Sequence, residues 1–158
     1  MGIISRILKK SHDSRPLNRP PYSPYDPEYI ALMNNYYSTM DNIESLWSVI
    51  YNLNDYYGPE SERLKSLCLK NLDELFAWQN AAARRNIAQM PGHVPAYHRL
   101  AMLYEKRGQY EFAINVCVDA IRNDATSDGS KGGMKGRLAR MLKKAKLDPS
   151  PEIRQFLM

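Results

Sequence analysis

A chain of 158 residues can bury roughly two thirds of its unfolded surface in one ordinary domain, so neither disulfides nor a metal are needed to hold it together. Hydrophobic residues make up 44% and charged residues 25%, near the averages for soluble globular proteins, and no run approaches the ~18 apolar residues of a membrane span. The net charge of +5 is concentrated at the ends: Lys and Arg outnumber Asp and Glu by five to one in residues 1–25 and by eight to three in 126–158, whereas 26–125 hold nine against thirteen.

The first predicted element is a basic, Pro-rich extension over residues 1–26, which we expect to be flexible. Five prolines between residues 11 and 27, with no apolar periodicity, favour an extended and solvated segment. Residues 1–10 place one apolar side opposite one basic side, a pattern that allows weak contact with a membrane surface; docking on the body and disorder are the alternatives. The apolar side consists of Ile3, Ile4, Ile7 and Leu8, and the basic side of Arg6, Lys9 and Lys10. This apolar stretch is too short for a secretory signal, so we expect a cytoplasmic protein.

The remaining residues, 27–158, are predicted to form a single helical domain that starts with a long antiparallel hairpin over 27–89. Asp26 and Pro27 provide a helix cap and a first helical position. Large side chains then recur at alternating spacings of four and three residues, namely Tyr29, Met33, Tyr36, Met40, Ile43, Trp47, Ile50, Asn54 and Tyr57. This heptad period predicts a narrow seam against another helix, and a homodimer through the 29–57 seam is the alternative. Asp41 with Glu44 leaves open a break into two helices.

The second helix of the hairpin is predicted to restart at Pro59, after the stop at Gly58. Its apolar positions follow a helical spacing and comprise Leu64, Leu67, Cys68, Leu72, Leu75, Phe76, Ala82 and Ile87. Pro91, Gly92 and Pro95 cannot all lie inside a helix, so this one is expected to end at the stretch MPGHVP. Cys68 and Cys117 stand alone in helical patterns, and we expect both to be buried free thiols.

A pair of shorter helices is predicted over residues 94–123, turning at Gly108, which can adopt the left-handed conformation of a sharp helix end. The core positions of this pair are expected to be Tyr97, Leu100, Ala101, Tyr104, Tyr110, Ala113, Cys117 and Ala120.

This pattern of aromatic, small and Gly positions resembles a tetratricopeptide repeat, a helix-turn-helix unit of about 34 residues. The match covers residues 94–125; it departs at Ala125, where the family usually has Pro, and 34 residues upstream there is no second copy. The resemblance implies that the first helix lines a concave groove for a protein partner, a peptide or helix. The residues expected in this groove are His98, Arg99, Met102, Glu105 and Lys106. The alternative is a purely structural role, in which these side chains pack against another helix of the same chain.

The last predicted element is a basic capping helix and tail over residues 133–157. Its apolar stripe consists of Met134, Leu138, Met141, Leu142 and Ala145. Its cations are candidate contacts for an anionic partner and comprise Lys135, Arg137, Arg140, Lys143, Lys144 and Lys146. A solvated cap that closes the repeat is the alternative.

No motif for catalysis or for cofactor binding occurs in the sequence, so we expect neither an enzyme nor a cofactor. His93 and His98 could bind a metal in principle, but no nearby Cys, Asp or Glu completes a site, and we predict none. The sequence therefore predicts an all-α, non-catalytic protein-protein interaction module, an adaptor or assembly subunit. The alternatives are an accessory protein that binds nucleic acid or an anionic surface through its basic termini, and an uncharacterised enzyme.

Overall fold

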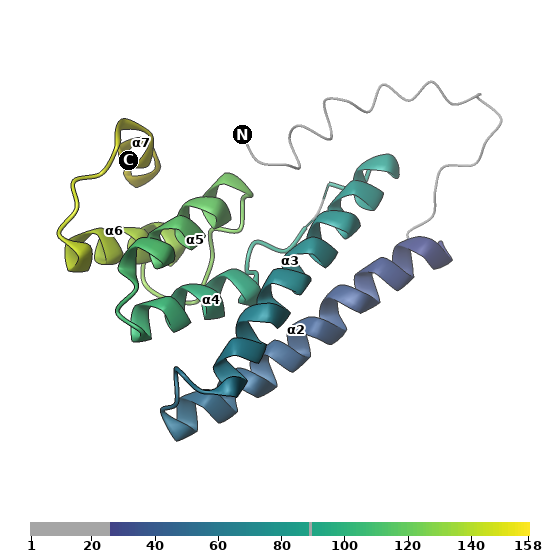
Figure 1. The fold of residues 1–158 in the computed structure, drawn as a ribbon. Helices are drawn as coiled ribbons and strands as arrows, with labels where there is room; N and C mark the ends of the chain where they lie inside the picture. Colours follow the sequence, from purple (N-terminus) through teal and green to yellow (C-terminus); the bar gives the residue numbers. More distant parts are fainter. Residues whose placement is uncertain (1–25, 89) are drawn as a thin grey trace.

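The computed structural model describes residues 26–88 and 90–158, and within them the fold is all-α (Figure 1). The described residues form six helices, namely α2 (Pro27–Leu53), α3 (Pro59–Arg84), α4 (Pro95–Lys106), α5 (Tyr110–Arg122), α6 (Gly133–Ala145) and α7 (Pro151–Leu157). They contain no strand, only an isolated bridge between His93 and Ser127. The predictions of a flexible extension and of membrane contact by residues 1–10 fall outside the described residues, except at Asp26.

The helix α2 is continuous from Pro27 to Leu53, without the break considered near Asp41. The Asp26 carboxylate caps it, accepting hydrogen bonds from the backbone N–H groups of Glu28 at 2.9 Å and Tyr29 at 3.2 Å. The helix ends where Asn54 adopts a left-handed conformation, with φ 53°.

The predicted seam of α2 is buried at Tyr29, Tyr36, Ile43, Trp47 and Ile50, where it faces the rest of the chain. The prediction that the seam continues to Asn54 and Tyr57 is wrong. The helix ends at Leu53, and the 3.5-residue spacing has no meaning beyond that residue. Tyr57 is 71% exposed, and its neighbour Tyr56 is buried in its place.

The predicted hairpin is confirmed: α3 runs back along α2 as its antiparallel partner (Figure 1). It ends at Arg84, earlier than the MPGHVP stretch, because Asn86 takes up a left-handed conformation with φ 56°. The Ile87 N–H then donates to the Ala82 carbonyl at 2.8 Å, which closes the helix end. Arg85, the C-cap residue of α3, donates a hydrogen bond from Nη2 to the Asp26 carboxylate at 3.2 Å. This contact joins the end of α3 to the start of α2.

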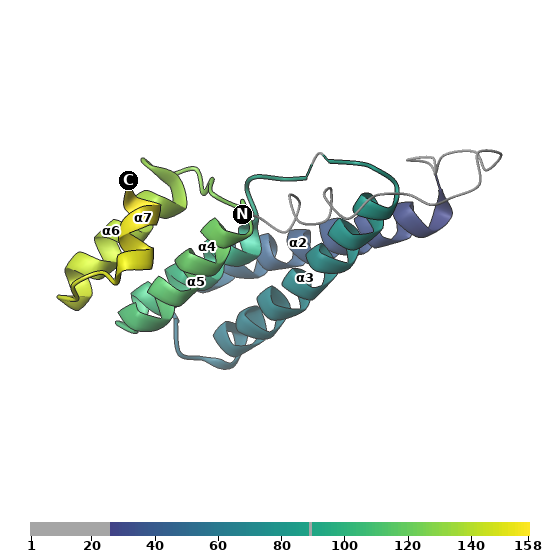
Figure 2. The ribbon, with the colours of Figure 1, turned by 90° about the horizontal axis from the view of Figure 1, so that it is seen from above.

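The helices α4 and α5 pack against each other and turn at Gly108, whose φ is 70°. The predicted core of the pair is buried at Tyr97, Leu100, Ala101, Ala113, Cys117 and Ala120, while Tyr104 and Tyr110 are half-buried. On its other side α4 contacts α3 and α2, so that α4 lies between the hairpin and α5 (Figure 2).

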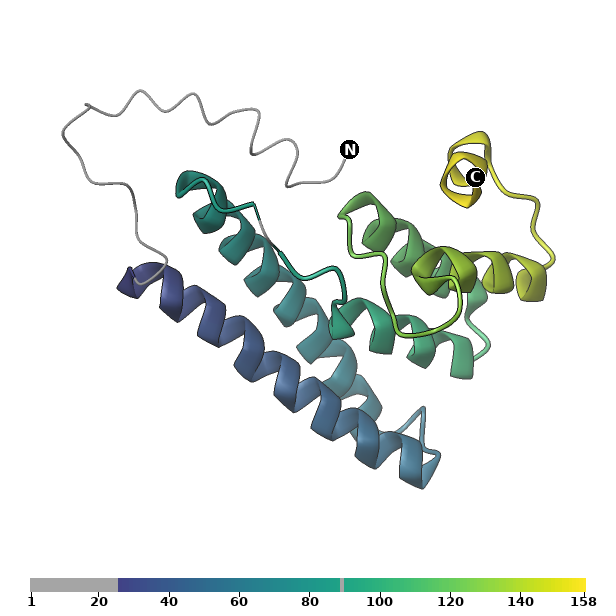
Figure 3. The same cartoon turned by 180° about the vertical axis from the view of Figure 1, so that it is seen from behind.

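The helix α6 packs on α5 and buries the predicted stripe residues Met134, Leu138, Met141 and Leu142. The predicted tail contains a further helix, α7, which places Ile153 and Phe156 against the core. From behind, α2, α4 and α6 follow one another across the molecule (Figure 3). None of the helices in the described part of the chain has the length and hydropathy needed to cross a membrane.

Candidate functional site

The row of side chains on α4 that was predicted to face a partner is divided between two neighbours. Arg99 turns to α2, where its Nε donates to Glu44 Oε1 at 3.1 Å and its Nη2 to Glu44 Oε2 at 2.6 Å. The same guanidinium lies 5.4 Å from the centre of the Trp47 ring, within the range of a cation–π interaction. Met102, one turn further on, accepts a hydrogen bond at its sulfur from Arg99 Nη1 at 3.5 Å.

Lys106 continues this contact towards the end of the hairpin. Its Nζ lies 5.6 Å from the centre of the Tyr56 ring and 6.0 Å from that of Tyr51. Tyr51 is 54% exposed, although a cation of the same chain already lies over its ring. Together these side chains form what we call the α2–α4 face, which consists of Glu44, Trp47, Tyr51, Arg99, Met102 and Lys106.

Glu105 and His98 do not belong to this face. The Glu105 carboxylate pairs with two cations of α6, Arg137 at 3.5 Å and Lys144 at 3.4 Å. The Nδ1 of His98 lies 3.5 Å from Nε2 of His93, which belongs to the loop before α4. The five residues of the predicted groove are therefore separated: Arg99, Met102 and Lys106 lie beside α2, Glu105 pairs with α6, and His98 lies against His93.

His98 is held neutral at physiological pH. Desolvation by burial is the largest cause, with the positive charges of Arg99 and Arg137 adding to it, and together they lower the pKa of His98 to about 4. The imidazole therefore contributes no charge to the space between α4 and α6.

The prediction that Arg137 meets an anionic partner is wrong, because this side chain is only 7% exposed and is engaged within the chain. Its Nε donates to Asp128 Oδ2 at 2.8 Å, and the Asp128 carboxylate is fully buried. Desolvation raises the pKa of Asp128, but the hydrogen bonds from Ser130 and Arg137 outweigh it and hold that pKa at about 2. The buried ion pair thus fastens the loop before α6 to the helix itself.

The other predicted cations of α6 point outward. Lys144 is half-exposed and shared with Glu105, whereas Lys135, Arg140, Lys143 and Lys146 are exposed. Arg140 donates from Nη1 to the Lys131 carbonyl and from Nη2 to Ser130 Oγ, each at 3.3 Å, and so is positioned over the preceding loop.

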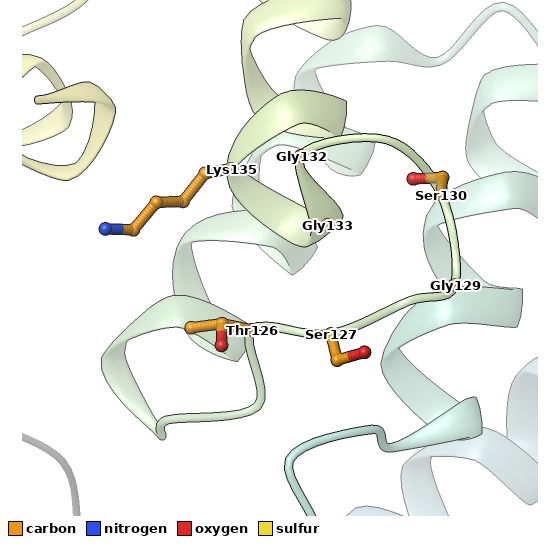
Figure 4. A pocket seen from close by; sticks show the side chains of 7 residues that line it. All are labelled: Thr126, Ser127, Gly129, Ser130, Gly132, Gly133 and Lys135. Carbon is orange, nitrogen blue, oxygen red and sulfur yellow. The ribbon is translucent and has the colours of Figure 1, made fainter.

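That loop forms a shallow pocket of about 560 Å³ at the start of α6 (Figure 4). Its lining is polar or glycine throughout, comprising Thr126, Ser127, Gly129, Ser130, Gly132, Gly133 and Lys135. The loop reaches back to the loop before α4, where the Ser127 N–H donates to the Gly92 carbonyl at 3.0 Å.

The side chains that could carry chemistry are placed apart or shielded. Within residues 26–88 and 90–158, no three side chains of the types His, Cys, Asp and Glu gather at a spacing suited to a metal. Both cysteines are free and buried, as predicted, and burial raises the pKa of each thiol to about 12. Neither thiol is therefore a ready nucleophile.

Sequence reasoning missed Glu44, Tyr51 and Asp128. Tyr51 and Glu44 each lie one residue after a seam position of α2, so the heptad pattern, which marks the seam alone, gives no sign of them. Asp128 is an acid in a Gly- and Ser-rich stretch, which gives no sign of burial. The one available signal was the excess of cations over acids in residues 126–158, since a buried Arg137 requires an acidic partner.

Comparison with known proteins yields no relative: no family model matches the chain, and no curated protein or solved structure is similar enough to be matched.

Proposed function

We propose that this chain is a non-catalytic protein-protein interaction module, an adaptor or assembly subunit, which takes a peptide or helix of its partner across the α2–α4 face. The observation that carries the proposal is the exposed ring of Tyr51, which packs against Trp47 and lies under the ammonium group of Lys106. Tyr, Met and Arg are enriched at protein interfaces: Tyr and Arg combine apolar contact area with hydrogen bonding, and Met supplies a flexible apolar group.

The side chains of this face are already positioned in the free chain. Glu44 and Trp47 hold the guanidinium of Arg99, and two tyrosines flank Lys106. A partner that binds here has less side-chain freedom to remove, which lowers the entropic cost of association. The thioether of Met102, half-buried at the centre, adapts its shape to different apolar groups.

The arrangement of α4 and α5 supports a tetratricopeptide-like pair within the module. Gly108 makes the left-handed turn, and the small residues Ala101, Ala113 and Ala120 are buried where the two helices approach each other. In a stack of such pairs the first helices line one face, and here Glu44–Arg99 and Glu105–Lys144 link α2, α4 and α6 in that order. On this proposal α6 is the cap of the stack.

The test is to capture partners of the tagged full-length chain from a lysate of its own cells, with and without nuclease, and to compare two variants. Met102→Glu places a charge at the centre of the face. Val49→Glu is the matched control, because Val49 is 46% exposed on α2 and points away from Tyr51, two residues and about 200° around the helix.

We expect a nuclease-resistant protein partner that Val49→Glu retains and Met102→Glu loses, with unchanged thermal unfolding of both variants. A partner that both variants retain equally would place the binding surface elsewhere. Material that disappears after nuclease treatment would contradict the proposal of a protein partner.

A further inference from the structure

The exposed cations of α6 form a surface that the proposed protein-binding function does not use. Lys131, Lys135, Arg140, Lys143 and Lys146 are all exposed, and they come from α6, the loop before it and its C-cap. At 1.5 Å per residue, Lys135 to Lys146 extend over about 16 Å of helix. The wheel positions of Lys135 and Lys143 lie about 80° apart, so these two side chains share one side of α6, and Lys146 follows at its C-cap.

These cations are not neutralised within the described part of the chain. The ion pairs of α6 are those of Arg137 with Asp128 and Glu105 and of Lys144 with Glu105, and no described carboxylate pairs with the other five. Elsewhere in the described residues Arg85, Arg99 and Arg107 are each engaged by a carboxylate of the chain. Five like charges on a short helix and its loop repel one another, and an anionic partner would relieve that repulsion.

We propose that this lysine-rich outer surface of α6 binds the phosphodiester backbone of a nucleic acid. Lysine is a flexible point charge suited to phosphate, and phosphate contacts in nucleic-acid complexes also come from hydroxyls and backbone N–H groups. The pocket beside the surface offers hydroxyls, because the side chains of Thr126 and Ser127 line it and Lys135 stands at its edge (Figure 4).

The same surface fits a membrane or a protein less well. The apolar stripe of α6 is buried in the core, and between residues 131 and 147 the one exposed large apolar side chain is Leu147, beside Lys146; a single side chain offers little area to insert among lipids. Protein interfaces are depleted of lysine and have an apolar core, for which Leu147 alone is exposed in this stretch. A backbone of closely spaced phosphates needs only the charges and the donors.

The experiment measures binding of the full chain to two fluorescein-labelled probes of mixed sequence, a 20-nucleotide single strand and a 20-base-pair duplex, by anisotropy between about 50 and 200 mM KCl. The test variant is Lys135→Gln/Lys143→Gln. The control is Arg63→Gln/Lys70→Gln on α3, which removes the same charge from side chains that are 67% and 65% exposed. Any difference between the variants then reports the position of the charges and not their sum.

We expect the test variant to reduce the magnitude of the log–log salt slope by about 1.4 for the single strand or 1.8 for the duplex, at about 0.7 and 0.9 per lost phosphate contact. The corresponding loss of affinity at 0.1 M salt is roughly 20- to 60-fold. The control and Met102→Glu should bind like the parent, which separates this surface from the α2–α4 face. Which probe binds more tightly distinguishes a single-stranded from a duplex backbone.

Three results would overturn the proposal. The first is that neither probe binds at about 50 mM KCl. The second is an equal loss of affinity in the test and control variants, which would make net charge the only cause. The third is that phosphatidylserine vesicles or polyglutamate bind the chain as strongly as the probes do and also depend on Lys135 and Lys143, which would make this a surface for anions in general.

Discussion

Gly136 shows how closely the chain approaches itself at the start of α6. A Cβ at this position would lie 2.5 Å from the Lys131 carbonyl oxygen, which belongs to the backbone and has little room to move. Gly133 is under the same constraint, with a Cβ placed 2.3 Å from the Thr126 carbonyl oxygen and a φ of 61°. These two glycines therefore permit a loop to lie directly on a helix.

We expect Gly136→Ala to destabilise the protein. Ala in a helix interior normally stabilises by about 1 kcal/mol over Gly, but here overpacking against the loop costs on the order of 1–3 kcal/mol. Urea unfolding measures the difference, with Gly92→Ala as the control, since nothing lies within 4 Å of a Cβ there. A Gly136→Ala variant more stable than its parent would show that the loop does not lie where we place it.

The free energy of unfolding should depend on pH in two separate windows. Because the pKa of His98 is about 4 in the folded chain against an ordinary 6.5, the unfolded chain binds an extra proton between these values, and stability falls as pH decreases through this window. Asp128 has a folded pKa of about 2 against 3.8, so its contribution is present above pH 3.8 and is lost as pH falls towards 2.

His98→Gln should flatten the upper window and Asp128→Asn the lower one, each leaving the slope of the other in place. Urea unfolding at pH 7, 5, 4 and 3 separates the two windows. A His98→Gln variant that keeps the full slope between pH 6.5 and 4 would assign that slope to other groups.

At the scale of the elements, the sequence predicted which segments are helical better than it predicted the residues at which the helices end. The predicted start of α2 is confirmed, because the cap at Asp26 and the fixed φ of Pro27 act on neighbouring residues and need no other part of the fold. The end of α3 was misplaced, because Asn86 alone marks it, and Asn takes a left-handed conformation only where the surroundings favour it. The prolines at 91 and 95 gave a stronger signal, yet lie beyond the true end.

The contact between α4 and α2 should be measurable as a coupling energy. Arg99 and Glu44 form a two-pronged, half-buried pair, so a double-mutant cycle with Arg99→Ala and Glu44→Ala should give a coupling on the order of 1 kcal/mol, above most exposed pairs. Arg99→Lys should lose most of it, because an ammonium cannot bind both oxygens and stack on Trp47 in the same way. A coupling near zero would mean that α4 is held against α2 by apolar packing alone.

At the scale of the whole molecule, the sequence predicted an all-α chain with a long hairpin, because amphipathic periods report burial directly. The candidate site was only partly predictable. Helical spacing places Arg99 and Met102 on one side of α4, but it cannot tell whether Glu44 or a partner meets them. The fate of each cation on α6 likewise depended on Asp128 and Glu105, which lie far from it in sequence or in an irregular loop.

The main packing of this fold is between helices that follow one another along the chain: α2 with α3, α3 with α4, α4 with α5, and α5 with α6. Contacts of this kind are local in sequence and favour rapid folding that spreads from one end. The residues of the hairpin, with the Asp26–Arg85 ion pair that joins its ends, all precede α4 in the chain and therefore leave the ribosome first. Each later helix packs mainly on the helix before it, so the order of synthesis matches an order in which the elements can assemble.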